Sequence, residues 1–300
     1  QNDLYLVEFI FHYGEEEEDR KYYFYIPYIN KGNTLKISDK EFLVMPILAD
    51  KVISIGDKII FINILTAKYS FSREYYTIVV NKRLCNIALI VTKLYKNQST
   101  KLEATTKAKI TVMHYLLANY GFRWVCQTLL GFIPEVSYDY DGSDKIVIES
   151  TGIIPRGYVK SRELYQKSRI KFLVNKEQYN EVVHYVLGNI LYIIDNFPDV
   201  IQIDNLDNTL IWKKLLAEII HSGNYTLDYL MEKITAHFED LNSNFDTVVV
   251  DKLKDVGVSA NNLMELMVII FKNFNNWIMT EDTRSLYYNK TFEVESYVLS

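Results

Sequence analysis

Proline and glycine are scarce in this chain of 300 residues, with 5 and 11 copies respectively. Segments rich in these residues form extended or flexible linkers, so their scarcity excludes long low-complexity connections and favours an ordered chain. Cysteine is scarcer still, because only Cys85 and Cys126 are present and they form no C-x-x-C pair. One disulfide between them is an open alternative, but we expect two separate thiols in a reducing compartment.

Long apolar runs are missing too. None reaches the roughly 20 residues that a membrane-spanning helix needs, and the most apolar long segment, 261–279, is interrupted by Glu265 and Lys272. The start, Gln1-Asn2-Asp3, lacks the basic residues that open a signal peptide. We therefore expect a cytoplasmic protein with no membrane contact. The missing initiator Met and the abrupt end lead us to expect a piece of a longer chain.

The familiar catalytic motifs are absent as well. The sequence contains no G-x-x-x-x-G-K-[ST], G-x-G-x-x-G or G-x-S-x-G pattern. We therefore expect no catalytic residue, no cofactor and no metal site in this chain. Its histidines lack the spacing of zinc ligands, and we expect His114 and His184 in the core or at its boundary; the five are His12, His114, His184, His221 and His237.

Charge, by contrast, is plentiful and unevenly divided. Residues 1–176 carry 25 basic and 19 acidic side chains, a net charge of +6. Residues 177–300 carry 8 basic and 19 acidic side chains, a net charge of −11. Such a division predicts two electrostatically distinct parts with different partners.

Two basic segments lie in the positive part. Residues 156–171 read RGYVKSRELYQKSRIK, with Tyr158 and Tyr165 among the cations and Glu163 as the one acid. Lysines also gather in 93–109. Cations of this kind neutralise phosphates and tyrosines stack on unpaired bases, although a solvated surface is the simpler alternative. The predicted nucleic-acid-binding residues are Arg156, Lys160, Arg162, Lys167, Arg169, Lys171, Lys101, Lys107 and Lys109.

The first half of the chain has the composition of strands. Residues 4–13 and 21–28 are β-rich and flank the acidic run GEEEEDR, which predicts a hairpin with a solvated tip. Further strands are expected at 34–37, 41–46, 58–65 and 75–80, while 83–95 fits a strand or a helix. Residues 137–150 are expected to form a hairpin that turns at Asp141-Gly142, because the glycine and glutamate there do not match the positions of a calcium loop.

In the remaining segments, apolar residues recur at the spacing of a helix. One helix is expected over 105–130, broken or kinked at Gly121, and further helices near 177–196, 209–221, 226–241, 245–256, 260–279 and 284–299. The predicted fold class is α+β, with an antiparallel, strand-rich N-terminal half and a helical C-terminal half. We divide the chain into an antiparallel β scaffold (1–104), a mixed basic middle segment (105–176) and an all-helical acidic region (177–300).

One segment resembles a known family. In residues 25–44, Ile26-Pro27, Gly32-Asn33 and Glu41 follow one another as in the N-terminal part of multisubunit RNA polymerase β subunits. The helical half is more similar to the divergent, split subunits of large AT-rich phages, which the composition also fits. The family's Asn-Gly turn is Ser38-Asp39 here, and its Ser-Gln after the second strand is Met45-Pro46. Leu35, Ile37 and Val44 complete the matching order.

The resemblance implies a function. The chain would form the protrusion and lobe, one wall of the DNA channel, in contact with DNA and the other polymerase subunits. The nucleotidyltransferase residues and their Mg²⁺ would lie on a partner subunit, and the protein would act in the host cytoplasm or reside in the virion. The alternatives are a phage virion structural or adaptor protein that binds through its acidic helical half, and an isolated enzyme such as a nuclease.

Overall fold

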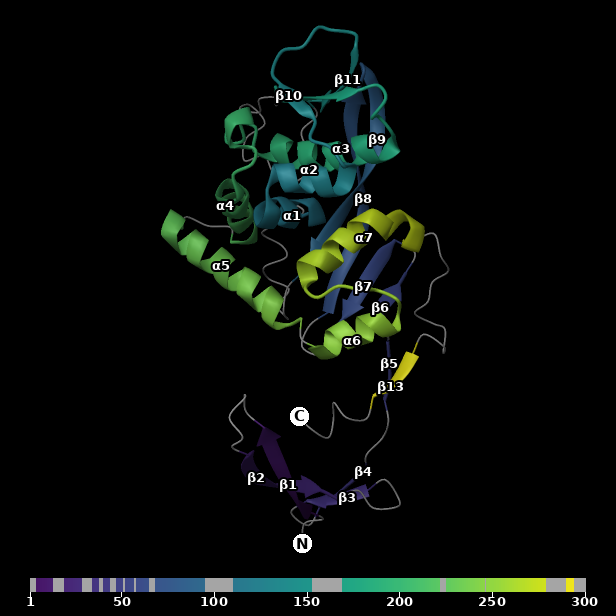
Figure 1. The fold of residues 1–300 in the computed structure, drawn as a ribbon, viewed down its shortest axis with the longest axis vertical. Coiled ribbons are helices and arrows are strands. Elements are labelled where there is room, and N and C mark those ends of the chain that lie inside the picture. The colour runs from purple at the N-terminus through teal and green to yellow at the C-terminus, as the bar shows by residue number, and fades with distance from the viewer. Residues whose placement is uncertain are drawn as a thin grey trace. The chain divides into compact units, whose positions relative to one another are not determined.

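The computed structural model describes residues 4–12, 19–28, 34–37, 40–43, 47–50, 52–56, 58–64, 68–94, 110–152, 169–221, 225–245, 247–278 and 290–293. The chain divides into two compact units (Figure 1). The first contains residues 1–51 and 286–300, and the second contains residues 52–285.

The described part of the first unit consists of two-stranded antiparallel pairs. Strands β1 (Leu4–His12) and β2 (Asp19–Pro27) form the hairpin that the sequence predicts. Strands β3 (Thr34–Ile37) and β4 (Lys40–Leu43) pair next along the chain. Strand β5 (Ile47–Asp50) pairs with β13 (Lys290–Glu293), which comes from the far end of the sequence.

Strand β13 corrects one prediction, because residues 284–299 were expected to form a helix. Its Thr291 and Phe292 are residue types that favour strands. Antiparallel pairing with β5 supplies the backbone hydrogen bonds that a helix would otherwise make.

The second unit is built on a seven-stranded sheet in which every pairing is antiparallel. Its order is β10-β12-β11-β8-β7-β6, with β9 pairing β8. The long strand β8 connects through a tight turn to β9, so the segment that fitted a strand or a helix is a strand. The strands are β6 (Ile53–Ile55), β7 (Ile59–Asn63), β8 (Lys68–Val80), β9 (Arg83–Lys93), β10 (Glu135–Ser137), β11 (Lys145–Ser150) and β12 (Lys171–Asn175).

The hairpin predicted over 137–150 is wrong. Strands β10 and β11 do not pair with each other, because β12 lies between them. Phe172, Leu173 and Val174 are each at most 2% exposed, and an apolar strand buried on both faces takes a central place in a sheet. Lys171 therefore opens a central strand.

The helices occupy most of the remaining chain. The helix predicted over 105–130 is two helices, separated at Gly121, whose φ is 83°. Asn180, Asn208 and Thr226 cap α3, α4 and α5 through their side chains. The helices are α1 (Val112–Tyr120), α2 (Phe122–Leu130), α3 (Glu181–Asn196), α4 (Thr209–Ile220), α5 (Leu227–Ser243), α6 (Thr247–Asp255) and α7 (Leu263–Ile278). The α+β prediction is confirmed.

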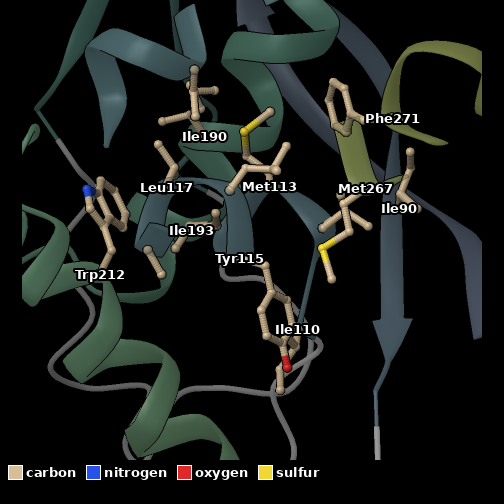
Figure 2. Packing of buried hydrophobic residues seen from close by; sticks show 14 of the residues in the cluster. Ile90, Ile110, Met113, Tyr115, Leu117, Ile190, Ile193, Trp212, Met267 and Phe271 are labelled. Atoms are coloured by element: carbon tan, nitrogen blue, oxygen red, sulfur yellow. The ribbon is translucent and has the colours of Figure 1, made fainter. Parts of the chain in front are cut away.

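One hydrophobic cluster joins the helices to the sheet. Helix α3 packs against β8, β9 and β11, and Gly188 permits this approach because a Cβ there would lie 2.4 Å from Ile87 Cδ1. Figure 2 shows Met113 and Leu117 of α1 near Ile190 of α3. No helix among the described residues is long and apolar enough to cross a membrane.

Candidate nucleic-acid interface

Two of the nine predicted nucleic-acid-binding residues lie in the described part of the chain. Arg169 precedes β12 and is exposed, and Lys171 is the first residue of β12 and is half-buried. Within the described residues neither side chain makes an ion pair. The other predicted residues lie outside the described residues: Arg156, Lys160, Arg162, Lys167, Lys101, Lys107 and Lys109.

The strand register places Lys171 in a row of side chains across the sheet. Lys171 lies directly opposite Ser137 on β10 and Glu149 on β11. Glu149 lies opposite Val79 of β8, which in turn lies opposite Leu84 of β9. Directly opposite residues share one face of an antiparallel pair. The row is therefore one line of side chains that β12, β11, β8 and β9 present together.

The same face continues along β8. Alternate residues of a strand share a face, so Arg73, Tyr75 and Thr77 accompany Val79. Tyr75 is 65% exposed and Leu84 is 73% exposed. We call the surface formed by Arg73, Tyr75, Val79, Leu84, Glu149 and Lys171 the open sheet face.

The opposite face of these strands is closed. Ile78, Ile148 and Phe172 are fully buried there. Tyr76 is 8% exposed and donates a short hydrogen bond to Asp195 of α3. Tyr75 and Leu84 are exposed on the other face, which is buried farther along the two strands at Phe71 and Ile90.

Arg73 and Tyr75 form the best-defined pair on the open sheet face. The guanidinium carbon of Arg73 lies 5.7 Å from the centroid of the Tyr75 ring, within the range of a cation–π contact. Arg73 Nε is buried and has no hydrogen-bond partner in the described part of the chain. An exposed aromatic ring beside a cation suits the stacking of an unpaired base with its phosphate nearby.

The charge on this face is mixed. Glu149 stands opposite Lys171 in the register, although Lys171 forms no ion pair within the described residues. The net positive charge therefore comes from Arg73 and from the flanking cations. Lys82 and Arg83 are exposed at the β8–β9 turn, where Asn81 and Lys82 have φ values of 46° and 65°. Such a turn projects its side chains from the end of the sheet.

Arg73, Tyr75, Lys82 and Arg83 were not predicted as site residues from the sequence. The strand was expected to begin only at Tyr75, so Arg73 was not assigned to a face. The alternation of buried residues changes phase within residues 68–80, so the continuous register of β8 with β9 is what places Arg73 with Tyr75. The Asn81-Lys82 turn between two β-rich runs is the corresponding signal for the basic turn.

His114 and His184 belong to the packing of the second unit. His114 is 1% exposed, its Nε2 lies 3.0 Å from the Trp212 carbonyl oxygen, and burial lowers its pKa to about 4. His184 is half-buried, its Nδ1 lies 3.0 Å from the Tyr179 hydroxyl, and burial lowers its pKa. The expected core and boundary positions of His114 and His184 are confirmed. No three His, Cys, Asp or Glu side chains gather as metal ligands in the described ranges.

The two thiols are separate. Cys85 on β9 is half-buried and Cys126 on α2 is buried, and both are free. Burial raises the pKa of Cys126, with Asp207 as a lesser cause. The thiol is therefore protonated at neutral pH and contributes to packing.

Comparison with known proteins adds one finding to this geometry. A family model described as "Non-virion RNA polymerase subunit" matches residues 2–300. No curated protein matches the chain.

Proposed function

The chain belongs to the non-virion RNA polymerase subunit family, and from that premise we propose that it forms part of the DNA channel wall of such a polymerase, as a β-type subunit. Its partners are then the other polymerase subunits, and its place of action is inside the host cell. The virion structural or adaptor alternative gains no support from a non-virion family.

The observation that supports the channel-wall role is the basic composition of residues 156–171, the last of which opens β12. Residues 156–171 lead directly into β12, whose Lys171 belongs to the open sheet face. That face also carries Tyr75 and Arg73. A segment rich in arginine and lysine, and a sheet face with an exposed aromatic ring, have the composition that contacts DNA backbone and unpaired bases.

The chemistry of transcription is assigned to the partners. We propose that this chain positions DNA and that nucleotidyl transfer, with its Mg²⁺, takes place on another subunit.

Charge reversal tests the role of the basic segment. Polymerase assembled with Arg156, Lys160, Arg162 and Lys167 changed to Glu is compared with wild-type polymerase for DNA affinity over a range of salt concentrations. Each lost phosphate contact is expected to reduce the slope of log K against log salt by roughly 0.9, so the variant binds more weakly and with a flatter slope.

A matched control comes from the acidic helical region. Lys252, Lys254 and Lys272 are exposed there, and their reversal to Glu changes net charge without touching the basic segment. The control is expected to keep the wild-type slope. An unchanged slope in the first variant, or an equal loss in both, contradicts the channel-wall role.

A further inference from the structure

Strand β9 forms one edge of the sheet in the second unit, because among the described strands it pairs with β8 alone. The strands at the other ends of the sheet, β6 and β10, have three residues each. Strand β9 has eleven, and its register with β8 contains no bulge. Sheets commonly end in short or bulged strands, since a long row of unpaired backbone groups invites another strand. Of the described edges, β9 is therefore the one with the length to receive a strand.

The backbone groups of β9 divide between its two sides by position. The two-residue turn at Asn81 and Lys82 makes Val80 and Arg83 the first hydrogen-bonded pair of the hairpin. In an antiparallel pair, such residues recur at every second position. The odd-numbered residues of β9 therefore bond to β8, and the even-numbered ones direct their N–H and C=O groups away from the sheet.

This chain covers the far part of the outward edge itself. The Thr92 nitrogen donates to the Ile110 carbonyl oxygen at 2.9 Å, and the adjoining residues form an antiparallel bridge. The side-chain amide of Asn189 on α3 donates to the Ala88 carbonyl oxygen at 2.9 Å. Both bonds go to even-numbered residues, as the hairpin phase requires. An extended segment thus already pairs with this edge at its far end.

The near part of the edge is open. No described residue bonds to the backbone N–H and C=O groups of Leu84 and Asn86 or to the N–H of Ala88. Leu84 is 73% exposed, and Asn86 is exposed as well. Residues 84–88 also contain no charged side chain and no proline, which are the usual protection of an exposed edge. We call these five backbone groups the open edge.

The open edge favours an extended polypeptide as its occupant. Its donors and acceptors repeat at every second residue, roughly 7 Å apart, which is the spacing of another β-strand. A phosphate backbone offers acceptors alone, so it would leave the carbonyl groups of Leu84 and Asn86 without donors. The backbone pattern therefore distinguishes a protein strand from nucleic acid.

Charge indicates one side chain of that strand. Lys82 and Arg83 are exposed where the open edge begins, and neither makes an ion pair within the described residues. An acidic residue directly across from this position would be stabilised, and a basic one would be repelled.

We propose that the open edge receives an extended segment of another polymerase subunit as an added β-strand, with an acidic side chain beside Lys82 and Arg83. The added strand bonds to the backbone of Leu84 and Asn86 and ends where Asn189 occupies the Ala88 carbonyl. This inference rests on the proposed function only in treating the chain as one subunit of a polymerase.

Hydrogen exchange of single backbone amides tests the added strand, in the free chain and in polymerase assembled without DNA. The amides of Leu84 and Asn86 are expected to exchange rapidly in the free chain and slowly in the assembly. Cys85 and Ile87 bond to β8 and are expected to exchange slowly in both. If Leu84 and Asn86 exchange as rapidly in the assembly as in the free chain, no strand is added there.

A proline at the edge tests the same bonds by affinity. Asn86→Pro removes an outward N–H, which an edge strand tolerates, and Asn86→Ala keeps it. Both variants lose the side-chain bond to Thr77. Binding to the remaining subunits, purified together without this chain, is expected to be about 10-fold weaker or more for Asn86→Pro than for Asn86→Ala. Equal affinities contradict the added strand, and the exchange measurement on the wild type does not depend on the folding of either variant.

Charge reversal tests the acidic side chain. Lys82→Glu with Arg83→Glu is expected to weaken binding to the subunits in the absence of DNA and to reduce its dependence on salt. Lys252→Glu with Lys254→Glu on α6 is the matched control, because both lysines are exposed, and it is expected to bind as the wild type does. Unchanged affinity in the first variant overturns the acidic side chain beside the turn.

The remaining outcomes separate this proposal from the proposed function. If the wild type assembles with the other subunits while its edge amides stay rapid, the added strand fails and the proposed function stands. If the wild type does not assemble with them, both fail. Edge amides that are already slow in the free chain show that this chain or, where dilution makes them rapid, a second copy occupies the edge. Protection that appears only with DNA identifies nucleic acid, and each of these results overturns a subunit strand.

Discussion

Gly121 separates α1 from α2 with a φ of 83° and a ψ of 169°, a combination that only glycine adopts readily. A Cβ at this position would lie 2.9 Å from Asp207 Oδ1 and 3.2 Å from the Asp207 carbonyl oxygen. Asp207 Oδ1 also accepts a hydrogen bond of 2.8 Å from the backbone nitrogen of Arg123. The sequence indicated a break here because glycine interrupts a helical pattern, and that prediction is confirmed.

The Gly121→Ala substitution is expected to lower the free energy of unfolding by about 1–3 kcal/mol, because it combines backbone strain with the contact to Asp207. Thermal or denaturant unfolding measures this loss. Gly131→Ala is the control, since Gly131 has a φ of 81° but nothing within 4 Å of an added Cβ. A smaller loss at Gly121 than at Gly131 would contradict the argument.

Residue type alone does not show which side chains form the open sheet face. Arg73 and Tyr75 lie in a β-rich segment, and only the strand register shows which face of the sheet they occupy. Lys171 lies in a basic segment by composition, yet the structure places it at the start of a central strand opposite Glu149. Neither fact follows from residue type, because each depends on strands that are distant in sequence.

At the scale of elements, the helices of the second half were the most predictable part. Asn180, Asn208 and Thr226 cap helices that begin within a few residues of the expected positions, because capping and periodicity are local properties. Strand order was not predictable. The insertion of β12 between β10 and β11, and the pairing of β13 with β5, depend on contacts between distant segments.

The packing of α5 on α1 predicts a dependence of stability on pH. The Tyr115 hydroxyl lies 2.8 Å from His237 Nε2, and burial, with nearby His221, lowers the pKa of His237 to about 4. The unfolded chain takes up this proton near pH 6.5 and the folded chain does so only near pH 4. Stability is therefore full above pH 6.5 and falls as the pH decreases toward 4, by up to about 3 kcal/mol for this histidine.

His237→Gln measures this contribution. Glutamine retains a hydrogen-bonding group for Tyr115 but does not titrate, so the variant is expected to lose less stability than the wild type between pH 7 and pH 5. Denaturant unfolding at both pH values provides the comparison. Parallel losses in the two proteins would show that His237 contributes nothing to acid sensitivity.

At the scale of the whole molecule, charge and exposed apolar surface are divided among different parts. The positive charge is concentrated before residue 177 and the negative charge after it. The β1–β2 hairpin exposes apolar side chains of its own, among them Phe9 and Phe24. The proposed function assigns DNA to the positive part, and complementary charge would direct protein partners to the negative part.

The central claim is that the basic segment lies against DNA in the assembled polymerase. Photo-crosslinking tests it most directly, with a photoreactive amino acid in place of Tyr158 or Tyr165 and, as control, in place of Tyr229 on α5, which is 38% exposed. We predict crosslinks to promoter DNA from positions 158 and 165 and none from position 229. If positions 158 and 165 give no crosslinks to DNA, or if position 229 gives as many, the basic segment does not lie against DNA.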